Sequence, residues 1–287
     1  MKLGFIGIGV MGEAMVKNLI NAGNSLHVYN RTKSKTDGVV AAGALYHPTP
    51  MEVMDNSEII FTMVGFPKDV EEVYFGDKGI FQSEKIKGKI LVDMTTTKPV
   101  LALKIFEEAT RLGATSLDAP VSGGDLGAKN GTLTIMVGGS DAAYQQVHPY
   151  FEIMGTTINL MGGPSMGSHT KMANQIGIAG TMTAMTETLV YAKAAGLDLQ
   201  QVIDTLSGGG ASTWSLTNYS PRILKEDFTP GFFVKHFIKD LGIALEEAEK
   251  MEIQLPSTEL AKSLYEKLAK KGYNDEGTQS LIKLWWD

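Results

Sequence analysis

The sequence contains no cysteine and shows little that would mark a secreted, membrane-bound or nucleic-acid-binding protein. The absence of cysteine from its 287 residues excludes disulfide bonds, thiolate nucleophiles and cysteine-ligated metals. Because such a composition is typical of a reducing compartment, we expect a cytoplasmic protein, and no metal site is predicted. The net charge of −6 leaves no excess of basic residues, so neither nucleic acid nor an anionic membrane is expected as a partner.

Targeting and membrane-spanning segments are not expected either. A strand predicted from residue 2 leaves no room for a signal peptide. The longest uncharged helical stretch lies between Lys171 and Glu187, and it is too short and too polar to span a bilayer. With 43% hydrophobic and 20% charged residues, the composition is that of a globular protein, and the length predicts two domains.

A glycine-rich turn near the start of the chain is the most informative feature present. An apolar run at residues 3–6 predicts a buried strand, Gly7-Ile8-Gly9-Val10-Met11-Gly12 follows, and a helical pattern comes next. Strand, turn and helix in this order form the setting of a dinucleotide-binding fingerprint. In that fingerprint Gly7 allows the tight turn, Gly9 lets the backbone approach a pyrophosphate, and Gly12 allows close helix–strand packing. We therefore expect residues 7–12 to bind a dinucleotide.

The second predicted strand indicates which dinucleotide. Residues 26–29 lead into Asn30-Arg31-Thr32, where an acidic residue would bind the ribose 2′-hydroxyl of NAD. Asn30 lacks the carboxylate that would repel a 2′-phosphate, Arg31 can pair with this phosphate bidentately, and Thr32 adds a hydroxyl donor. These residues predict NADP as the cofactor. NAD is the alternative, in which Arg31 is only a solvated surface residue.

Helix and strand patterns alternate along the first half of the chain. Further strands are predicted at residues 44–46, 58–64, 89–94, 115–118, 132–137 and 156–160, with a hairpin turn at residues 130–131. This alternation predicts an α/β fold with a doubly wound, mostly parallel sheet, which binds ligands beyond the carboxyl ends of its strands. Met63, Val64 and Thr96 follow such strand ends and are expected to face the cofactor, although core packing is the alternative for Met63.

The second half of the chain carries only helical patterns. Glycine and proline at residues 162–164 mark a break in composition. We expect residues 1–162 to form an NADP-binding Rossmann domain and residues 163–287 to form an all-helical substrate and oligomerisation domain. A long helix from about residue 168 to 195 should join them. Because no charge follows Lys171 for four turns, this helix is expected to be buried nearly all round.

Two places in the sequence carry groups suited to chemistry. Ser122-Gly123-Gly124 follows a strand and offers a hydroxyl and backbone amides to a small oxyanion, although an ordinary loop would have the same composition. Lys171 lies in the first turn of the long helix, where the macrodipole disfavours a cation, and Asn174 and Gln175 share its face. Desolvation and the dipole would ease loss of its proton and suit it to acid/base catalysis. The alternative is a lysine whose ammonium reaches solvent.

The chain resembles the β-hydroxyacid dehydrogenase family over its whole length, on four motifs in the same order. This family includes 3-hydroxyisobutyrate dehydrogenase, tartronate semialdehyde (2-hydroxy-3-oxopropionate) reductase and the glyoxylate/succinic semialdehyde reductases. The motifs are Gly7-Ile8-Gly9-Val10-Met11-Gly12 with Asn18-Leu19, Asp118-Ala119-Pro120-Val121-Ser122-Gly123-Gly124, Gly167 with Lys171 and Asn174-Gln175, and Pro230-Gly231-Phe232 with Lys239-Asp240-Leu241. Departures from the family pattern are Ile8, Val16, Ser165 and Gln175.

The resemblance implies a reaction and a set of roles. It implies an NADP-dependent oxidoreductase that interconverts a small carboxylate-bearing aldehyde and its hydroxyacid, with Lys171 as the acid/base. It further implies that Ser122, Gly123 and Gly124 bind the substrate carboxylate together with Asn174 or Gln175. Thr96 would contact the nicotinamide ribose, Lys239 would reach the cofactor, and Asp240 would orient Lys171. Relatives form dimers or tetramers, so a homodimer or homotetramer is expected.

Several alternatives remain open at this point. An NAD-dependent 3-hydroxyisobutyrate dehydrogenase would share every motif except the cofactor preference. Imine reductases of the same architecture usually lack a lysine at the position of Lys171, and 6-phosphogluconate dehydrogenases have a much longer helical part. A non-catalytic NADP-binding adaptor would be expected to lose this lysine or to carry extra basic segments. The sequence does not choose among glyoxylate, succinic semialdehyde, tartronate semialdehyde and methylmalonate semialdehyde, a choice expected to depend on Thr213, Trp214, Phe232 and Trp285-Trp286.

Overall fold

The structure, a computed structural model, describes residues 1–286. The chain divides into two compact units, Met1–Lys171 and Met172–Asp287. Helix α8 (Met166–Ala194) begins within the first unit and continues through the second. The expected boundary between an NADP-binding domain (residues 1–162) and a substrate and oligomerisation domain (residues 163–287) stays a prediction.

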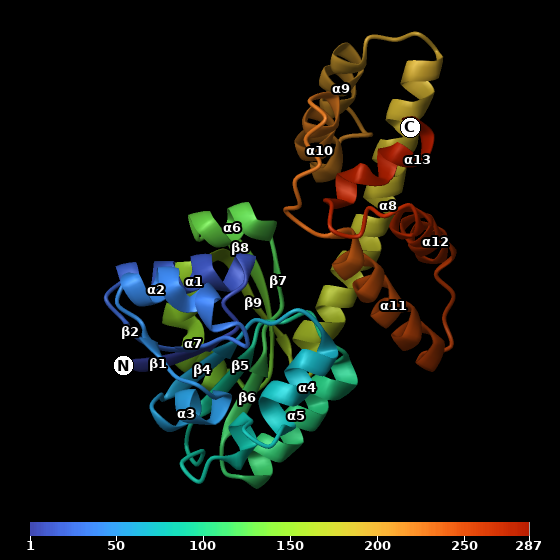
Figure 1. Ribbon diagram of the computed structural model, residues 1–287. Coiled ribbons are helices and arrows are strands. Elements are labelled where there is room, and N and C mark those ends of the chain that lie inside the picture. Colours follow the sequence, from blue (N-terminus) through green and yellow to red (C-terminus); the bar gives the residue numbers. More distant parts are fainter. Residues whose placement is uncertain (287) are drawn as a thin grey trace. The chain divides into compact units, whose positions relative to one another are not determined.

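A single sheet organises the first unit, and it confirms the predicted doubly wound fold (Figure 1). Its strands are β1 (Lys2–Ile6), β2 (Ser25–Tyr29), β3 (Leu45–Tyr46), β4 (Ile59–Thr62), β5 (Ile90–Asp93), β6 (Thr115–Asp118), β7 (Val121–Ser122), β8 (Leu133–Gly138) and β9 (Gly155–Gly162). The spatial order is β3-β2-β1-β4-β5-β6-β8-β7, with β9 paired to β8. Strands β1 to β6 pair in parallel, whereas β8 runs antiparallel to β6 and β7. The strand order reverses direction at β1, where such sheets bind their ligands.

Helices cover both faces of this sheet, and each face has its own apolar core. The helical segments are α1 (Val10–Asn21), η1 (Lys33–Thr36), α2 (Asp37–Ala41), α3 (Pro50–Asp55), α4 (Pro67–Phe75), η2 (Ile80–Gln82), α5 (Pro99–Arg111), α6 (Gly124–Asn130) and α7 (Asp141–Met154). In β4, Ile59 and Phe61 pack with residues of α1 and α7, while Ile60 packs with α3, α4 and α5. This alternation follows from the two-residue period of a strand. It explains why strands buried on both faces read as continuous apolar runs.

The second unit is helical, as predicted. Its elements are the greater part of α8, then α9 (Leu199–Ser207), α10 (Trp214–Leu224), α11 (Val234–Lys250), α12 (Pro256–Lys270), η3 (Thr278–Ile282) and α13 (Lys283–Trp286). One core joins α8, α11 and α12 around Phe237 and Tyr265, and another joins α8, α9 and α10 around Met185 and Leu189. Between residues 172 and 286 the only β pairing is an isolated bridge from Phe233 to Gly277.

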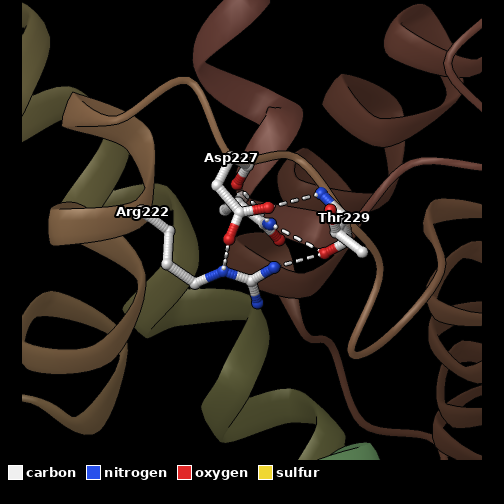
Figure 2. A network of polar contacts seen from close by, with 4 residues as sticks. Arg222, Asp227 and Thr229 are labelled. Atoms are coloured by element: carbon white, nitrogen blue, oxygen red, sulfur yellow. Dashed lines mark hydrogen bonds and ion pairs between the residues drawn. The ribbon is translucent and has the colours of Figure 1, made fainter.

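A polar network fixes the loop between α10 and α11 (Figure 2). The Arg222 guanidinium donates through Nε to Asp227 Oδ2 at 2.8 Å and through Nη2 to the Thr229 carbonyl at 2.5 Å. The Thr229 amide donates to Asp227 Oδ1 at 3.0 Å. These bonds from Arg222 and Thr229 hold the pKa of the Asp227 carboxyl well below its usual range. The network orders the loop that leads to Phe232, one of the residues expected to shape substrate choice.

Two sequence-based expectations about local structure were wrong. The dipeptide at residues 130–131 is not a hairpin turn, because residues 124–130 form α6 and Gly131 caps it with φ 66°. An Asn-Gly pair suits either role, since both need a residue with positive φ. Helix α8 is not buried nearly all round, because Ala173, Ala184 and Tyr191 are exposed on it.

Within residues 1–286, helices that combine the length and the apolar character needed to cross a membrane are absent.

A pair of histidines links β2 to the turn after β3. His27 is 6% exposed, and its Nδ1 lies 2.8 Å from Nε2 of His47. A hydrogen bond between two imidazoles needs one N–H donor and one lone pair, so at least one ring must be neutral. Burial lowers the pKa of His27 below its ordinary value, and the nearby His47 and Lys2 lower it further.

This pair predicts that the protein loses stability in mild acid. Because folding lowers the pKa of His27, the unfolded chain binds more protons than the folded one, and the free energy of unfolding falls as pH falls below about 6.5. His27→Gln should reduce the difference in unfolding free energy between pH 7 and pH 5.5, measured by urea denaturation. His148→Gln, which changes a histidine outside this pair, should leave that difference unchanged. An identical pH dependence in His27→Gln and the wild type would contradict the prediction.

Candidate active site

The glycine-rich turn between β1 and α1 contains two glycines that the fold requires and one that it does not. Gly7 has φ +102°, and a Cβ there would lie 2.1 Å from the Met63 carbonyl oxygen. A Cβ on Gly12 would lie 2.0 Å from the Gly7 carbonyl oxygen. Gly9 has an ordinary φ of −95°, and a Cβ there would meet no atom within 4 Å. The turn thus leaves open space over Gly9.

The other residues of this turn divide between core and surface. Ile8 is 2% exposed and belongs to the core, while Met11 packs partly against it. Val10, the first residue of α1, is 59% exposed. Beyond the glycines, Val10 is therefore the side chain of residues 7–12 that is most accessible to a ligand.

The turn after β2 is tied to the glycine-rich turn through Asn30. Its Oδ1 accepts a hydrogen bond from the Ile8 amide at 3.0 Å, and its Nδ2 donates to the Thr32 carbonyl at 2.8 Å. Arg31 and Thr32 are exposed. The Arg31 side chain is 81% exposed, and its Nη1 lies 2.8 Å from Oδ1 of Asp69 in the first turn of α4. Asn30 fixes the backbone from which Arg31 extends.

The segments after β4 and β5 lie at the same edge of the sheet as the glycine-rich turn. Met63 is half-buried against the core, and the Val64 amide donates to Thr95 Oγ1 at 3.0 Å. Thr95 and Thr97 are buried, with exposures of 2% and 1%, whereas Thr96 is half-buried. The outer two of the three threonines face inward, and Thr96 is the one that solvent or a ligand can reach.

Lys171, on the second turn of α8, turns its amine inward to the end of the sheet. Its Nζ donates a hydrogen bond of 2.8 Å to the Val121 carbonyl, and the residue is 6% exposed. Val121 directly precedes Ser122, Gly123 and Gly124, which end β7 and begin α6. Gly123 is exposed, with φ +124°, and Ser122 is half-buried. The amine therefore lies beside the Ser-Gly-Gly turn. The alternative of a lysine whose ammonium reaches solvent does not apply to Lys171.

Sequence reasoning assigned no role to Asp118, which ends β6. Its Oδ1 accepts from the Ser165 amide at 2.9 Å and its Oδ2 from the Ser168 amide at 2.6 Å, so the carboxylate caps the start of α8. Burial raises the pKa of Asp118, while the amides of Ser168 and Ser165 act to lower it. The signal was present in the sequence, because an acidic residue ends an otherwise buried strand.

Close backbone packing accompanies this cap. A Cβ on Gly167 would lie 2.4 Å from the Asp118 carbonyl oxygen, and a Cβ on Gly138 would lie 2.4 Å from Asp118 Oδ1. Ser165 has φ +71°, a backbone conformation that glycine adopts more readily than serine. The start of α8 is thus held in contact with β6 and β8.

The remaining predicted residues form a buried polar chain within the second unit. Asn174 Nδ2 donates to Gln175 Oε1 at 2.7 Å, and Gln175 Nε2 donates to Asp240 Oδ2 at 2.6 Å. Lys239 Nζ lies 2.9 Å from Asp240 Oδ1. Gln175 and Asp240 are almost fully buried, with exposures of 0% and 1%. Asp240 contacts Lys239 and Gln175, and its expected action on Lys171 stays a prediction.

The groups at this edge of the first unit suit a dinucleotide. Open space over Gly9, an exposed guanidinium at Arg31 and a half-buried threonine at Thr96 suit the pyrophosphate, a further phosphate and a ribose. No group of three histidine, aspartate or glutamate side chains that could hold a metal ion occurs in residues 1–286.

Substitution by alanine should have different consequences at Gly9 and at Gly12: weaker cofactor binding at the first and a less stable fold at the second. Gly9→Ala should change the free energy of unfolding by less than about 1 kcal/mol, because its backbone conformation suits alanine and its Cβ meets no atom. It should still weaken cofactor binding by about tenfold or more, since the methyl group occupies the space over the turn. Gly12→Ala should destabilise the fold by about 2 kcal/mol or more, because its Cβ overlaps the Gly7 carbonyl.

Urea denaturation and equilibrium titration with NADPH and NADH measure these two effects separately. A Gly9→Ala variant that binds both cofactors as the wild type does would contradict the prediction, as would one that unfolds like Gly12→Ala.

Comparison with known proteins agrees with this architecture. Residues 2–163 match the family model described as the NAD binding domain of 6-phosphogluconate dehydrogenase. Residues 165–285 match the model described as NAD-binding of NADP-dependent 3-hydroxyisobutyrate dehydrogenase.

Individual relatives match along nearly the whole chain. A probable 3-hydroxyisobutyrate dehydrogenase-like protein of Arabidopsis thaliana is 46% identical over 98% of this chain and 84% of its own length. The 2-hydroxy-3-oxopropionate reductase of Escherichia coli is 40% identical over 99% of this chain and 96% of its own. The solved structure of Mycobacterium tuberculosis 3-hydroxyisobutyrate dehydrogenase with L-serine superposes with a TM-score of 0.90, at 26% identity, over 100% of this chain and 99% of that one. The chain therefore belongs to the β-hydroxyacid dehydrogenase family and is an NAD(P)-dependent oxidoreductase.

Proposed function

We propose that this oxidoreductase uses NADP to interconvert a small carboxylate-bearing aldehyde and the corresponding hydroxyacid, with Lys171 as the acid/base. The observation that carries the proposal is the hydrogen bond from Lys171 Nζ to the Val121 carbonyl. This bond holds the amine next to Ser122, Gly123 and Gly124. One place in the first unit thus offers a proton donor together with a hydroxyl and backbone amides for a carboxylate.

In reduction, Lys171 as an ammonium gives its proton to the oxygen of the substrate carbonyl. In oxidation, the neutral amine takes this proton from the hydroxyl group. The Val121 carbonyl restrains the amine in both directions, because it accepts from an ammonium or a neutral amine alike. A nicotinamide cofactor, when bound, would supply the hydride in reduction and accept it in oxidation. The Ser122 hydroxyl and the amides of Gly123 and Gly124 orient the substrate through its carboxylate.

The proposal also assigns binding roles to polar residues of the second unit. Asn174 and Gln175 lie one helical turn beyond Lys171 on α8, and Asp240 fixes the Gln175 amide. We assign substrate binding to Asn174 and Gln175, and a cofactor contact to Lys239. The relatives named above carry names that specify 3-hydroxyisobutyrate and 2-hydroxy-3-oxopropionate, both small acids, which favours a substrate of this class. A comparison of kcat/KM for glyoxylate and the succinic, tartronate and methylmalonate semialdehydes identifies the substrate.

The preference for NADP rests on the turn after β2. Asn30 places an amide where an NAD site needs a carboxylate, and it uses this amide to join two loops. The adjacent Arg31 guanidinium is exposed and has donors beyond the Nη1 that faces Asp69. Both features favour a 2′-phosphate over a 2′-hydroxyl.

Lys171→Ala should bind NADPH with an affinity close to that of the wild type and should lose about 10²- to 10⁴-fold in kcat, the usual contribution of a general acid. Lys129→Ala, which removes an exposed lysine from α6, serves as the control and should keep its activity. The test is NADPH oxidation with the four carbonyl substrates, beside a binding titration. Turnover by Lys171→Ala within a few-fold of the wild type on these substrates would falsify the role of Lys171.

Arg31→Ala should weaken NADPH binding by about 10- to 100-fold, because charged hydrogen bonds to the phosphate are lost. NADH binding should change much less. Arg111→Ala removes another exposed arginine, which pairs with Glu108 on α5, and it should affect neither cofactor. Equal losses for NADPH and NADH in Arg31→Ala, measured by equilibrium titration, would refute the preference for the 2′-phosphate.

A further inference from the structure

The guanidinium expected to bind the cofactor phosphate is already paired with a carboxylate of this chain. Arg31 Nη1 lies 2.8 Å from Asp69 Oδ1, and the two residues are 38 positions apart in the sequence. Arg31 follows β2, whereas Asp69 lies in the first turn of α4, after β4. The pair therefore joins the turn after β2 to the start of α4, at the edge of the sheet that carries the glycine-rich turn.

The carboxylate is the better fixed of the two partners. The Asp69 side chain is 15% exposed, its amide donates to the Phe66 carbonyl at 2.9 Å, and the adjacent Val70 is fully buried. The Arg31 side chain is 81% exposed, so it can move while its backbone stays in place. A ligand that binds this guanidinium therefore meets a carboxylate whose backbone is held at the start of α4.

Such a pair contributes little to the stability of the fold, because an exposed arginine gains only a weak and easily screened attraction. The effect of this pair on the binding of an anion by Arg31 is larger than its effect on the stability of the fold. A 2′-phosphate competes with Asp69 for the donors of Arg31, and the two negative groups repel each other across the guanidinium. A ribose 2′-hydroxyl carries no charge and meets neither penalty.

We infer that Asp69 is a specificity-determining residue that limits the preference of this site for NADP over NAD. It does so by holding Arg31 and by placing a fixed negative charge beside the position of the 2′-phosphate. The inference rests on the proposed binding of that phosphate by Arg31. It deepens the proposal, because it assigns the strength of the preference to a residue outside the fingerprint turn and outside the turn after β2.

Glu72 provides a matched control on the same helix. It lies one turn after Asp69 on α4 and is exposed. Burial raises the pKa of the nearby Tyr29, Tyr46 and Glu72 raise it further, and Arg31 acts to lower it. Glu72→Gln removes the same charge as Asp69→Asn from the same region. Within the described residues, the ion pair of Arg31 is with Asp69 and not with Glu72.

The test is equilibrium binding of NADPH and NADH to the full chain carrying Asp69→Asn or Glu72→Gln. Asp69→Asn should tighten NADPH binding by about threefold to tenfold and leave NADH binding within about twofold of the wild type. Glu72→Gln should produce less than half of this change in the ratio of the two affinities. The inference is overturned if Asp69→Asn weakens NADPH binding, changes both cofactors equally, or acts no more strongly than Glu72→Gln.

A double variant tests whether Asp69 acts through Arg31. In an Arg31→Ala background, Asp69→Asn should lose most of its effect on NADPH, because the competition for the guanidinium no longer exists. An undiminished effect there would overturn the role of the ion pair.

The outcomes distinguish this inference from the proposed function. Equal losses of NADPH and NADH in Arg31→Ala reject the preference for NADP itself. A selective loss in Arg31→Ala, combined with an unchanged affinity ratio in Asp69→Asn, rejects only the role of Asp69.

Discussion

The attachment of the first turns of α8 to the end of the sheet is the constraint on which the proposed chemistry depends. Asp118 accepts the amides of Ser165 and Ser168, and Lys171 donates to the Val121 carbonyl one turn later. The buried carboxylate offsets the partial positive charge at the start of the helix, where a cation is otherwise disfavoured. A lysine can thus be buried close to a helix start, and its amine is directed to the Ser-Gly-Gly turn.

At the edge of the sheet expected to bind the cofactor, neighbouring residues of one motif differ in role. Some are needed for the packing of the fold, and others are accessible to a ligand. Gly7 and Gly12 allow backbone contacts that any side chain would prevent, while Gly9 borders open space. In the same way Thr95 and Thr97 are buried and Thr96 is accessible. Asn30 joins two loops, and Arg31 extends from the backbone that it fixes. Residues adjacent in sequence therefore differ in what a substitution would damage, stability or binding.

Much of this architecture could be predicted from the sequence, because local signals and the fold agreed. The alternation of apolar runs with helical patterns predicted the doubly wound sheet. Contacts between distant segments could not be predicted. The cap that Asp118 provides to α8 spans 47 and 50 residues, and the pair of Arg31 with Asp69 spans 38. Helix α6 was missed because its Asn-Gly end suits a hairpin equally well.

Chemical rescue of Lys171→Ala by small primary amines tests the central claim most directly. If the lysine acts by exchanging a proton at the place where the Val121 carbonyl holds it, an added amine that enters the vacated space should restore turnover. We expect rescue by methylamine and ethylamine that saturates with concentration and increases with amine basicity. A tertiary amine such as triethylamine, which is too bulky for that space, should give none. Failure of every primary amine to raise the rate, in a variant that still binds cofactor and substrate, would contradict the assignment of Lys171 as the acid/base.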